Sequence, residues 1–396
     1  MNRRHFLRTG LAAAPALTLA GRLFAAPASS PRFLCVFLRG GYDCANFLIP
    51  WSSNFYYDSR PKIAIAKPDP AILDGALALD SDWALAPAAR DSLGQLYQQR
   101  QALFVPFAGT DDLSRSHFET QDSIELGQPV QGQRDFGSGF LARLATTLTG
   151  ATPIAFTDSL PLAFKGDAGI ASMSMQRVGK SPFDDTQTAT LRGMYVGSHL
   201  ESAVTEGLEL QQQMAQAMQE EMQAANRGAI TTKGFELTAE RMARLMRTQY
   251  RLGFVDVGGW DTHVNEGGAR GALATNLTSL SVGLATFAQS LGDEWNNTVV
   301  FVLSEFGRTF RENGNAGTDH GHGSVYWVLG GRINGGRIAG AQVRVAKDTL
   351  FQNRDYPVLN DYRSVLAGIF GGMWGLSPQQ LQVIFPGAPP LDLQVI

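Results

Sequence analysis

The sequence predicts an α/β fold in which a mostly parallel sheet carries helices on both faces. Short, continuous apolar runs such as 33–38 and 298–303 are typical of strands that are buried on both sides. Stretches with a helical period lie between these runs; in 272–292, for example, Leu277, Leu284 and Phe287 fall on one face. Strands that alternate with amphipathic helices are the pattern of a doubly wound sheet.

The elements follow in order along the chain. The predicted strands are 33–38, 102–107, 153–156, 252–257, 298–303 and 325–329. The predicted helices are 86–101, 118–126, 136–147, about 200–226, 236–250 and 272–292. Segment 157–196 has a mixed, loop-like composition and is expected to be an insertion over one end of the sheet.

The helical segment around 200–250 begins with a stripe of long apolar side chains. Leu210, Met214, Met218 and Met222 recur every four residues, which places them on one face of a helix. We expect this stripe to pack on the body of the protein. A soft surface for a protein partner is the alternative.

The composition excludes several classes of protein. The 396 residues include 33 basic and 36 acidic side chains, and 44% are hydrophobic, so general disorder is excluded and no nucleic-acid footprint is expected. Two cysteines exclude a disulfide scaffold and a cysteine-rich zinc module. A disulfide between Cys35 and Cys44 remains open, although Cys35 lies in an apolar run and is expected to be a buried thiol. No apolar run is long enough for a transmembrane segment.

The first 28 residues resemble a twin-arginine export signal. Arg3 and Arg4 form the arginine pair, residues 11–20 are weakly apolar, and Ala26 and Ala28 match a small-residue cleavage site. A short amphipathic helix is the alternative. The signal predicts a periplasmic or extracellular protein whose mature part, 29–396, is a single α/β domain.

Chemically active side chains lie in the loops that join the predicted strands. Because ligands bind at the carboxyl ends of parallel strands, these loops are the expected site. Asp43 follows the first strand, and two glycines let the backbone turn there. Ser116 or Ser114 follows the second strand and fits the N-cap of a helix, where free N–H groups can receive an anion.

The histidines gather in these same loops. Outside the signal, four of five histidines (His117, His263, His320 and His322) lie in these loops beside Asp, Glu or Ser, and only His199 lies elsewhere. The pattern predicts that several loops meet around one cation, with ligands Asp43, Asp261, His263, Glu305, Asp319, His320 and His322. A polar hydrogen-bonded cluster is the alternative. Mixed carboxylate and imidazole ligands favour zinc, manganese or iron over calcium.

Six stretches in this order resemble the twin-arginine-exported proteins of the domain-of-unknown-function 1501 family. They are 36–43, 56–61, 116–121, 259–263, 304–309 and 318–323. The family is similar by fold to the alkaline phosphatase and sulfatase superfamily. The resemblance therefore implies an alkaline-phosphatase-like three-layer sandwich.

The superfamily also implies roles for particular residues. Asp43 matches its strand-end metal ligand and Ser116 its nucleophile. Asp261 and His263 match a metal-binding pair, Glu305 stands at a second metal position, and His320 or His322 matches the last histidine. The resemblance implies one or two divalent ions, zinc or manganese, with Arg115 or Arg308 stabilising the ester oxygens.

Two departures from the superfamily pattern affect this expectation. Phe306 stands where a metal-binding histidine is usual, so Asp319, His320 or His117 compensates or one ion is lost. No Cys-x-Pro-x-Arg or Ser-x-Pro-x-Arg occurs, which argues against a formylglycine sulfatase.

The expected function is an exported metal-dependent hydrolase of phosphate or sulfate esters. Its substrate would be a small-molecule, glycan or lipid-linked anionic ester. The alternative is a non-catalytic, metal-stabilised periplasmic binding or assembly protein, which Phe306 and the methionine stripe favour.

Overall fold

The structure is a computed structural model that describes residues 31–166, 170–173, 185–208 and 234–396. Within these ranges the centre is a nine-stranded sheet. Its path runs β11 (Arg337–Ile338), β5 (Ala102–Gly109), β10 (Ser324–Leu329), β9 (Thr298–Ser304), β1 (Arg32–Leu38), β8 (Leu252–Val257), β6 (Pro153–Ala155), β7 (Ala171–Ser172), and β12 (Asn360–Asp361) also pairs with β5. The six predicted strands are all confirmed. The sheet is mostly parallel, and only β10 runs antiparallel to its neighbours β5 and β9.

Strand β1 shows why a continuous apolar run forms here. All seven of its residues are buried. Leu34, Val36 and Leu38 point into one hydrophobic core, whereas Phe33, Cys35 and Phe37 point into the other. Alternate side chains of a strand face opposite sides of the sheet, so both positions must be apolar when both faces are covered.

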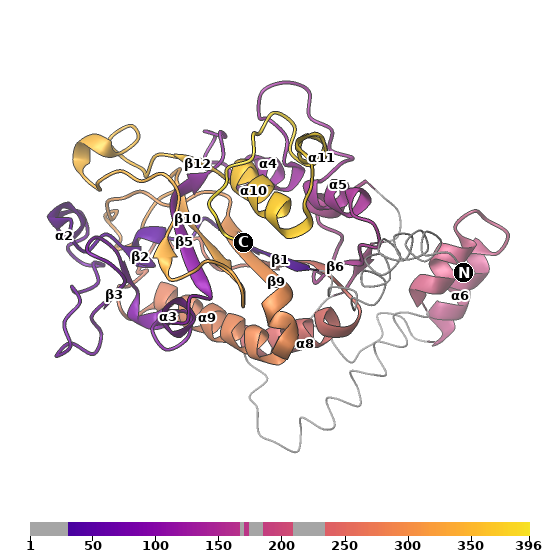
Figure 1. The fold of residues 1–396 in the computed structure, drawn as a ribbon, viewed down its shortest axis with the longest axis horizontal. Helices are drawn as coiled ribbons and strands as arrows, with labels where there is room; N and C mark the ends of the chain where they lie inside the picture. The colour runs from indigo at the N-terminus through magenta and orange to yellow at the C-terminus, as the bar shows by residue number, and fades with distance from the viewer. Residues whose placement is uncertain (1–30, 167–169, 174–184, 209–233) are drawn as a thin grey trace, which may run out of the picture.

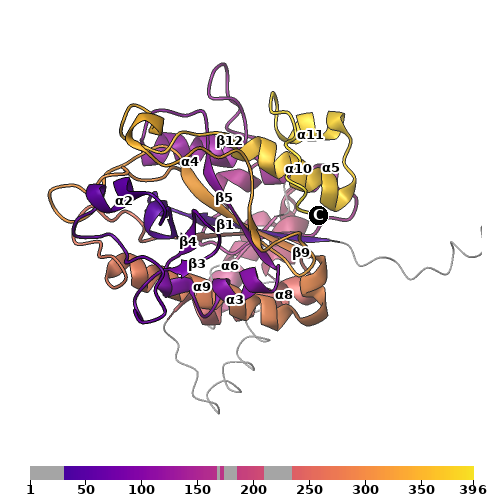
Figure 2. The same cartoon turned by 60° about the vertical axis from the view of Figure 1, so that its left-hand side comes forward.

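The helices form the two outer layers (Figure 1 and Figure 2). One face is covered by α3 (Leu93–Gln98), α8 (Phe235–Thr248) and α9 (Ala272–Leu291). The other face is covered by α4 (His117–Leu126), α5 (Phe140–Thr147), α10 (Tyr362–Trp374) and α11 (Pro378–Ile384). The predicted arrangement of helices on both faces is therefore confirmed.

Several elements differ from the prediction. The helix expected over 86–101 is divided into a 3-10 turn at Pro87–Ala89 and the short α3. A small sheet, β2 (Leu48–Ile49), β4 (Ala84–Leu85) and β3 (Leu77–Ala78), and helix α2 (Asn54–Ser59) were not predicted, nor were α10 and α11. Strands of two residues carry too little apolar pattern to be recognised.

The structure reaches some predicted segments only in part. The proposed signal, 1–28, and the methionine stripe at 210–222 lie outside the described residues. In the proposed insertion, a 3-10 turn (Leu162–Phe164), β7 and helix α6 (Asp185–Tyr195) are described. Within the described ranges, every helix is too short or too polar to cross a lipid bilayer.

Both cysteines are buried free thiols in this structure. Burial raises the pKa of Cys35, and it raises the pKa of Cys44 to about 12. Since the thiolate is the reactive form, neither cysteine is placed as a nucleophile or a metal ligand.

Candidate metal centre

The topology brings three loops to one edge of the sheet. Strands β1, β8 and β9 are parallel neighbours, and their last residues, Leu38, Val257 and Ser304, are in register. The segments that follow therefore leave the sheet side by side. Their contact is close at Gly40 (φ +125°), where a Cβ atom would lie 2.7 Å from the amide nitrogen of Asp261.

Four side chains converge at this edge, and we call them the His/Asp cluster: His117, Asp261, His263 and His320. Oδ1 of Asp261 lies 2.9 Å from Nε2 of His263 and 3.3 Å from Nε2 of His320. The Nε2 atoms of these two histidines are 3.1 Å apart. Nε2 of His117 lies 3.5 Å from Oδ2 of Asp261. His117, Asp261 and His320 also offer ligand atoms within 4.8 Å of one another.

Each histidine of the cluster is oriented by an oxygen on its other ring nitrogen. Nδ1 of His117 lies 2.8 Å from Oε1 of Glu305. Nδ1 of His263 lies 3.2 Å from Oδ1 of Asp319, and Nδ1 of His320 lies 3.0 Å from the carbonyl oxygen of Arg115. A carbonyl or an ionised carboxylate can only accept, so Nδ1 carries the proton in each ring. The Nε2 atoms of all three rings consequently face the cluster.

This arrangement leaves electron-rich atoms without a positive partner. Nε2 of His117 is buried and has no hydrogen-bond partner among the described residues. His263 and His320 present two acceptor nitrogens to each other. A proton or a cation must lie between such atoms, and imidazole nitrogens together with a carboxylate are a donor set suited to zinc or manganese.

Glu305 is predicted as a metal ligand, and in the structure its carboxylate contacts the far side of the His117 ring. Its carboxylate is fully buried and accepts hydrogen bonds from Nδ1 of His117, the Gly40 amide (2.8 Å) and Gln121 (2.9 Å). The hydroxyl of Ser304 donates to its other oxygen at 2.9 Å. Burial opposes ionisation, but the hydrogen bonds outweigh it and lower the pKa of Glu305.

Asp319 and His322 were also predicted as ligands, and both have other contacts. Asp319 accepts from His263 and, at 3.1 Å, from Asn313, so it orients the His263 ring. His322 is buried, and its ring packs 5.2 Å from the ring of Phe351. Burial lowers the pKa of His322 to about 4. Both side chains lie outside the His/Asp cluster, so their predicted role as ligands stays a prediction.

Asp43 is predicted as a metal ligand, and in the structure its carboxylate is bound by an arginine. Both residues are almost completely buried, and the guanidinium of Arg60 donates through two nitrogens to the two oxygens of Asp43. Nε of Arg60 also donates to the carbonyl of Phe310 at 2.7 Å. Nearby, burial and then the charge of Asp43 raise the pKa of Glu266 to about 9. This buried group of charges is a structural unit beneath the loops.

The two predicted anion-stabilising arginines are engaged with protein groups. Arg308 is buried and donates to Asp261 at 2.6 Å and to the hydroxyl of Thr318 at 3.2 Å. Burial raises the pKa of Asp261, but the hydrogen bond and charge of Arg308 outweigh this effect and lower it. The guanidinium of Arg115 binds Asp355 at 2.7 Å. Arg308 is therefore a positioning residue, and Arg115 contributes its carbonyl oxygen to His320.

Ser116 is the N-cap of α4, as the sequence predicts. Its hydroxyl accepts from the amide of Glu119 at 3.5 Å, which is a long hydrogen bond. It is half-buried and directly precedes His117 of the cluster.

The sequence matches the family model described as "Protein of unknown function (DUF1501)" over residues 30–385. The chain belongs to the DUF1501 family. A comparison of this DUF1501 protein with curated proteins finds no match.

Solved structures of low sequence identity are similar to this DUF1501 protein. One is a protein in the alkaline phosphatase superfamily from Vibrio parahaemolyticus, with 11% identity, a TM-score of 0.36 and coverage of 78% of this chain. This chain spans 62% of that protein, which is less than two thirds of its length. Another is the C-terminal periplasmic domain of EcEptC from Escherichia coli in complex with Zn, with 8% identity, coverage of 77% and 74%, and a TM-score of 0.35. A third is Ps i-CgsB in complex with k-i-k-neocarrahexaose, with 8% identity, coverage of 92% and 76%, and a TM-score of 0.38.

His117 is a cluster member that is absent from the ligand set predicted from the sequence, where it appears only as a substitute for the histidine missing at position 306. The Phe306 ring explains why His117, rather than a side chain at position 306, lies in the cluster. Its centroid lies 5.0 Å from that of His117 and 5.1 Å from that of His320. Phe306 thus forms an apolar wall against two cluster histidines, and His117 enters from helix α4 instead. The sequence feature that could have indicated His117 is its position directly after the N-cap residue Ser116.

The role of Glu305 in orienting His117 can be tested by removing the charge of its carboxylate. We expect Glu305→Gln to weaken zinc binding by about 10- to 100-fold, the usual effect of losing the partner that orients a ligating histidine. Competition titration with a chelating dye measures this affinity. Glu119→Gln removes an exposed carboxylate from the same helix and should leave the affinity unchanged. Equal affinities in Glu305→Gln and the unmodified protein would show that Glu305 does not orient His117.

Proposed function

We propose that this DUF1501 protein is an exported metal-dependent hydrolase of phosphate or sulfate esters. The observation that supports it is the orientation of the cluster: three imidazoles hold Nδ1 on oxygen acceptors and present Nε2 to the carboxylate of Asp261. A hydrogen-bonded polar cluster without an ion would not require every ring to present the same nitrogen. The export signal proposed for 1–28 would place this activity in the periplasm or outside the cell.

His117, Asp261, His263 and His320 would hold the divalent cation, zinc or manganese. When bound, such an ion supplies Lewis acidity toward the oxygens of the ester. We propose one ion rather than two, because Asp43 is bound by Arg60, Glu305 orients His117, and Phe306 has no ligand atom. Glu305, Asp319 and the Arg115 carbonyl fix the rings, and Arg308 fixes Asp261.

Ser116 is the proposed nucleophile. It lies at the start of α4, where the N–H groups of the first turn can receive the negative oxygens of the substrate. Among the described parts of the chain, the Ser116 hydroxyl makes only the long hydrogen bond to the Glu119 amide, which it would give up on reaction. The Ser116 oxygen would attack the phosphorus or sulfur atom as the bond to the ester oxygen breaks, and the Ser116 proton would pass to the departing alcohol. Water would then cleave the phospho- or sulfo-serine and restore the Ser116 hydroxyl.

The test is turnover of an aryl phosphate and an aryl sulfate by the zinc- or manganese-loaded protein. We expect Ser116→Ala to lower kcat/KM by at least about 100-fold. Ser114→Ala removes the neighbouring hydroxyl, which accepts from the amide of Ser116 and contacts Thr120, both at 3.3 Å. Because it leaves the Ser116 hydroxyl in place, it should cost less than about tenfold. Turnover that survives Ser116→Ala would reject Ser116 as the nucleophile.

A second candidate is a non-catalytic, metal-stabilised binding or assembly protein. Two features favour it. Phe306 offers no ligand atom at a position where a ligand is expected, and Arg60 binds the carboxylate of Asp43, a second expected ligand. This candidate predicts bound metal and no turnover of either ester. The same assay therefore separates the two candidates.

A further inference from the structure

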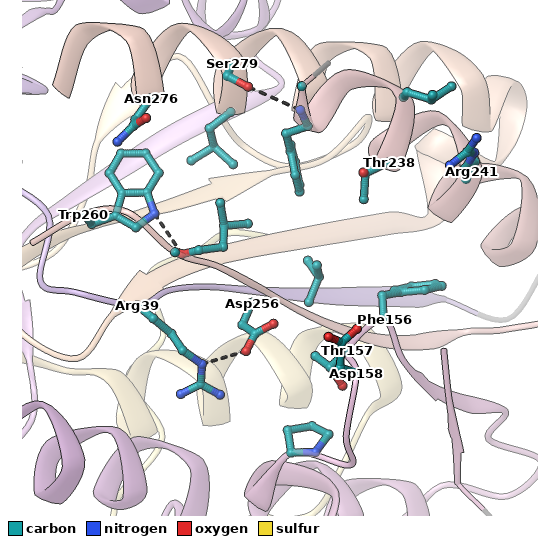
Figure 3. A pocket seen from close by; sticks show the side chains of 18 of the residues that line it. Arg39, Phe156, Thr157, Asp158, Thr238, Arg241, Asp256, Trp260, Asn276 and Ser279 are labelled. Carbon is teal, nitrogen blue, oxygen red and sulfur yellow. Dashed lines mark hydrogen bonds and ion pairs between the residues drawn. The ribbon is translucent and has the colours of Figure 1, made fainter. Parts of the chain in front are cut away.

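A cavity of about 840 Å³ lies beside the His/Asp cluster, and no function has been assigned to it so far. Helices α8 and α9 form one side, and the segments that follow β6 and β8 form the other (Figure 3). The lining includes Gly258 and Trp260, which lead directly into Asp261 of the cluster. Arg39 also lines it and precedes Gly40, whose amide donates to Glu305. The cavity and the cluster therefore share two loops at the carboxyl edge of the sheet.

Polar side chains enter the cavity from several elements. Thr238 and Arg241 come from α8, Ser279 from α9, and Asp158 from the segment after β6, and Figure 3 shows them around one space. Among the described residues, the side chains of Arg241 and Asp158 form no hydrogen bond or ion pair; Arg241 is half-buried and Asp158 is exposed. Asp256 is different, because Arg39 binds it at 2.8 Å. The cavity thus offers an unpartnered donor and an unpartnered acceptor.

Apolar groups share the lining with these polar ones. Phe235, Leu237, Val255 and Leu280 contribute hydrocarbon surface. A purely apolar ligand would cover this surface but would leave the half-buried guanidinium of Arg241 without a partner, which is costly. A multiply charged anion would meet the carboxylates of Asp158 and Asp256. A ligand with many hydroxyl groups avoids both problems, since each hydroxyl donates and accepts and its C–H surface is apolar.

We propose that this cavity binds the carbohydrate part of the substrate, so that the ester cleaved at the His/Asp cluster is a glycan ester. Its volume is within the range of sites that enclose ligands of drug size, which corresponds to a short oligosaccharide segment. The position of the ester rests on the proposed hydrolase function. Binding of the carbohydrate rests only on the cavity.

Hydrogen bonds connect the two sites. Nη1 of Arg39 donates to Oε1 of Gln121 at 2.9 Å, and Nε2 of Gln121 donates to Glu305 at 2.9 Å. Glu305 in turn orients His117. A saccharide at the Arg39 end of the cavity would therefore be joined to a cluster ligand through one continuous chain of side chains.

The test begins with the full chain on an array of oligosaccharides, followed by calorimetric titration with the one that binds best. We expect Arg241→Gln and Asp158→Asn each to weaken its binding by about tenfold, the factor that corresponds to about 1.4 kcal/mol. Arg244→Gln is the matched control, because it removes an arginine from the same helix outside the cavity lining and should change the affinity by less than about twofold.

A variant of the cluster separates this proposal from the proposed function. His263→Ala should retain saccharide binding while it loses metal and ester turnover. Saccharide binding without turnover in the metal-loaded unmodified protein would reject the hydrolase and keep the cavity assignment. Absence of binding to every oligosaccharide, or binding that Arg241→Gln and Asp158→Asn leave unchanged, would overturn the cavity assignment.

Discussion

The His320→Ala variant is expected to lose its divalent cation almost completely. Nε2 of His320 faces both Nε2 of His263 and Oδ1 of Asp261, so its removal takes away one of the four donors of the site. Loss of a ligand should exceed the 10- to 100-fold cost of losing only its hydrogen-bond partner, and we expect a weakening of about 1,000-fold. Elemental analysis after purification and dialysis measures the ion content per chain.

The control for this prediction is two residues further along the same loop. His322 is buried and lies outside the cluster, so His322→Asn should reduce stability and leave the ion content unchanged. Equal loss of metal in the two variants would mean that the loop, rather than the His320 ring, determines binding. Full retention of metal by His320→Ala would contradict the assignment of this ligand.

The Asp43→Ala variant is expected to have the largest effect on stability. It leaves the guanidinium of Arg60 buried without its counter-ion, and such a change destabilises proteins by about 3–5 kcal/mol. Urea unfolding measures the free energy difference. The metal affinity of the folded variant should stay within about threefold of that of the unmodified protein, since Asp43 holds Arg60 and not the ion.

The double variant Asp43→Leu/Arg60→Met tests the cause of that loss. Because an apolar pair leaves no buried charge, it should recover a large part of the stability that Asp43→Ala loses. If Asp43→Ala instead removes the metal at little cost in stability, Asp43 is a ligand and the sequence-based assignment is correct.

The central strands could be predicted because their physical signal is local. A strand such as β1, buried on both faces, must be apolar at every position, and this run is visible without knowledge of its neighbours. The direction of β10 is not a local property. It depends on the end of the sheet at which the chain enters β10 after the loop that carries His320. For the same reason, the pairing of two-residue strands such as β12 could not be predicted.

The location of the site could be predicted from the loops, but the role of each side chain could not. Asp43 and Glu305 both follow strands, as ligands would, but one meets Arg60 and the other meets His117. Arg60 comes from the end of α2, a helix with no recognisable apolar pattern. The choice between binding an ion and orienting a ligand depends on a few ångströms between loops, and spacing in the sequence does not contain this information.

X-ray absorption spectroscopy of the zinc-loaded protein tests the central claim most directly, because it reports the atoms bound to the ion. We predict one zinc per chain with three imidazole nitrogens and carboxylate oxygen in its first coordination sphere, at about 2.0–2.2 Å. The imidazole contribution should fall by one ring in His117→Ala. A chain that takes up no zinc, or zinc surrounded by oxygen alone, would contradict the His117–Asp261–His263–His320 site.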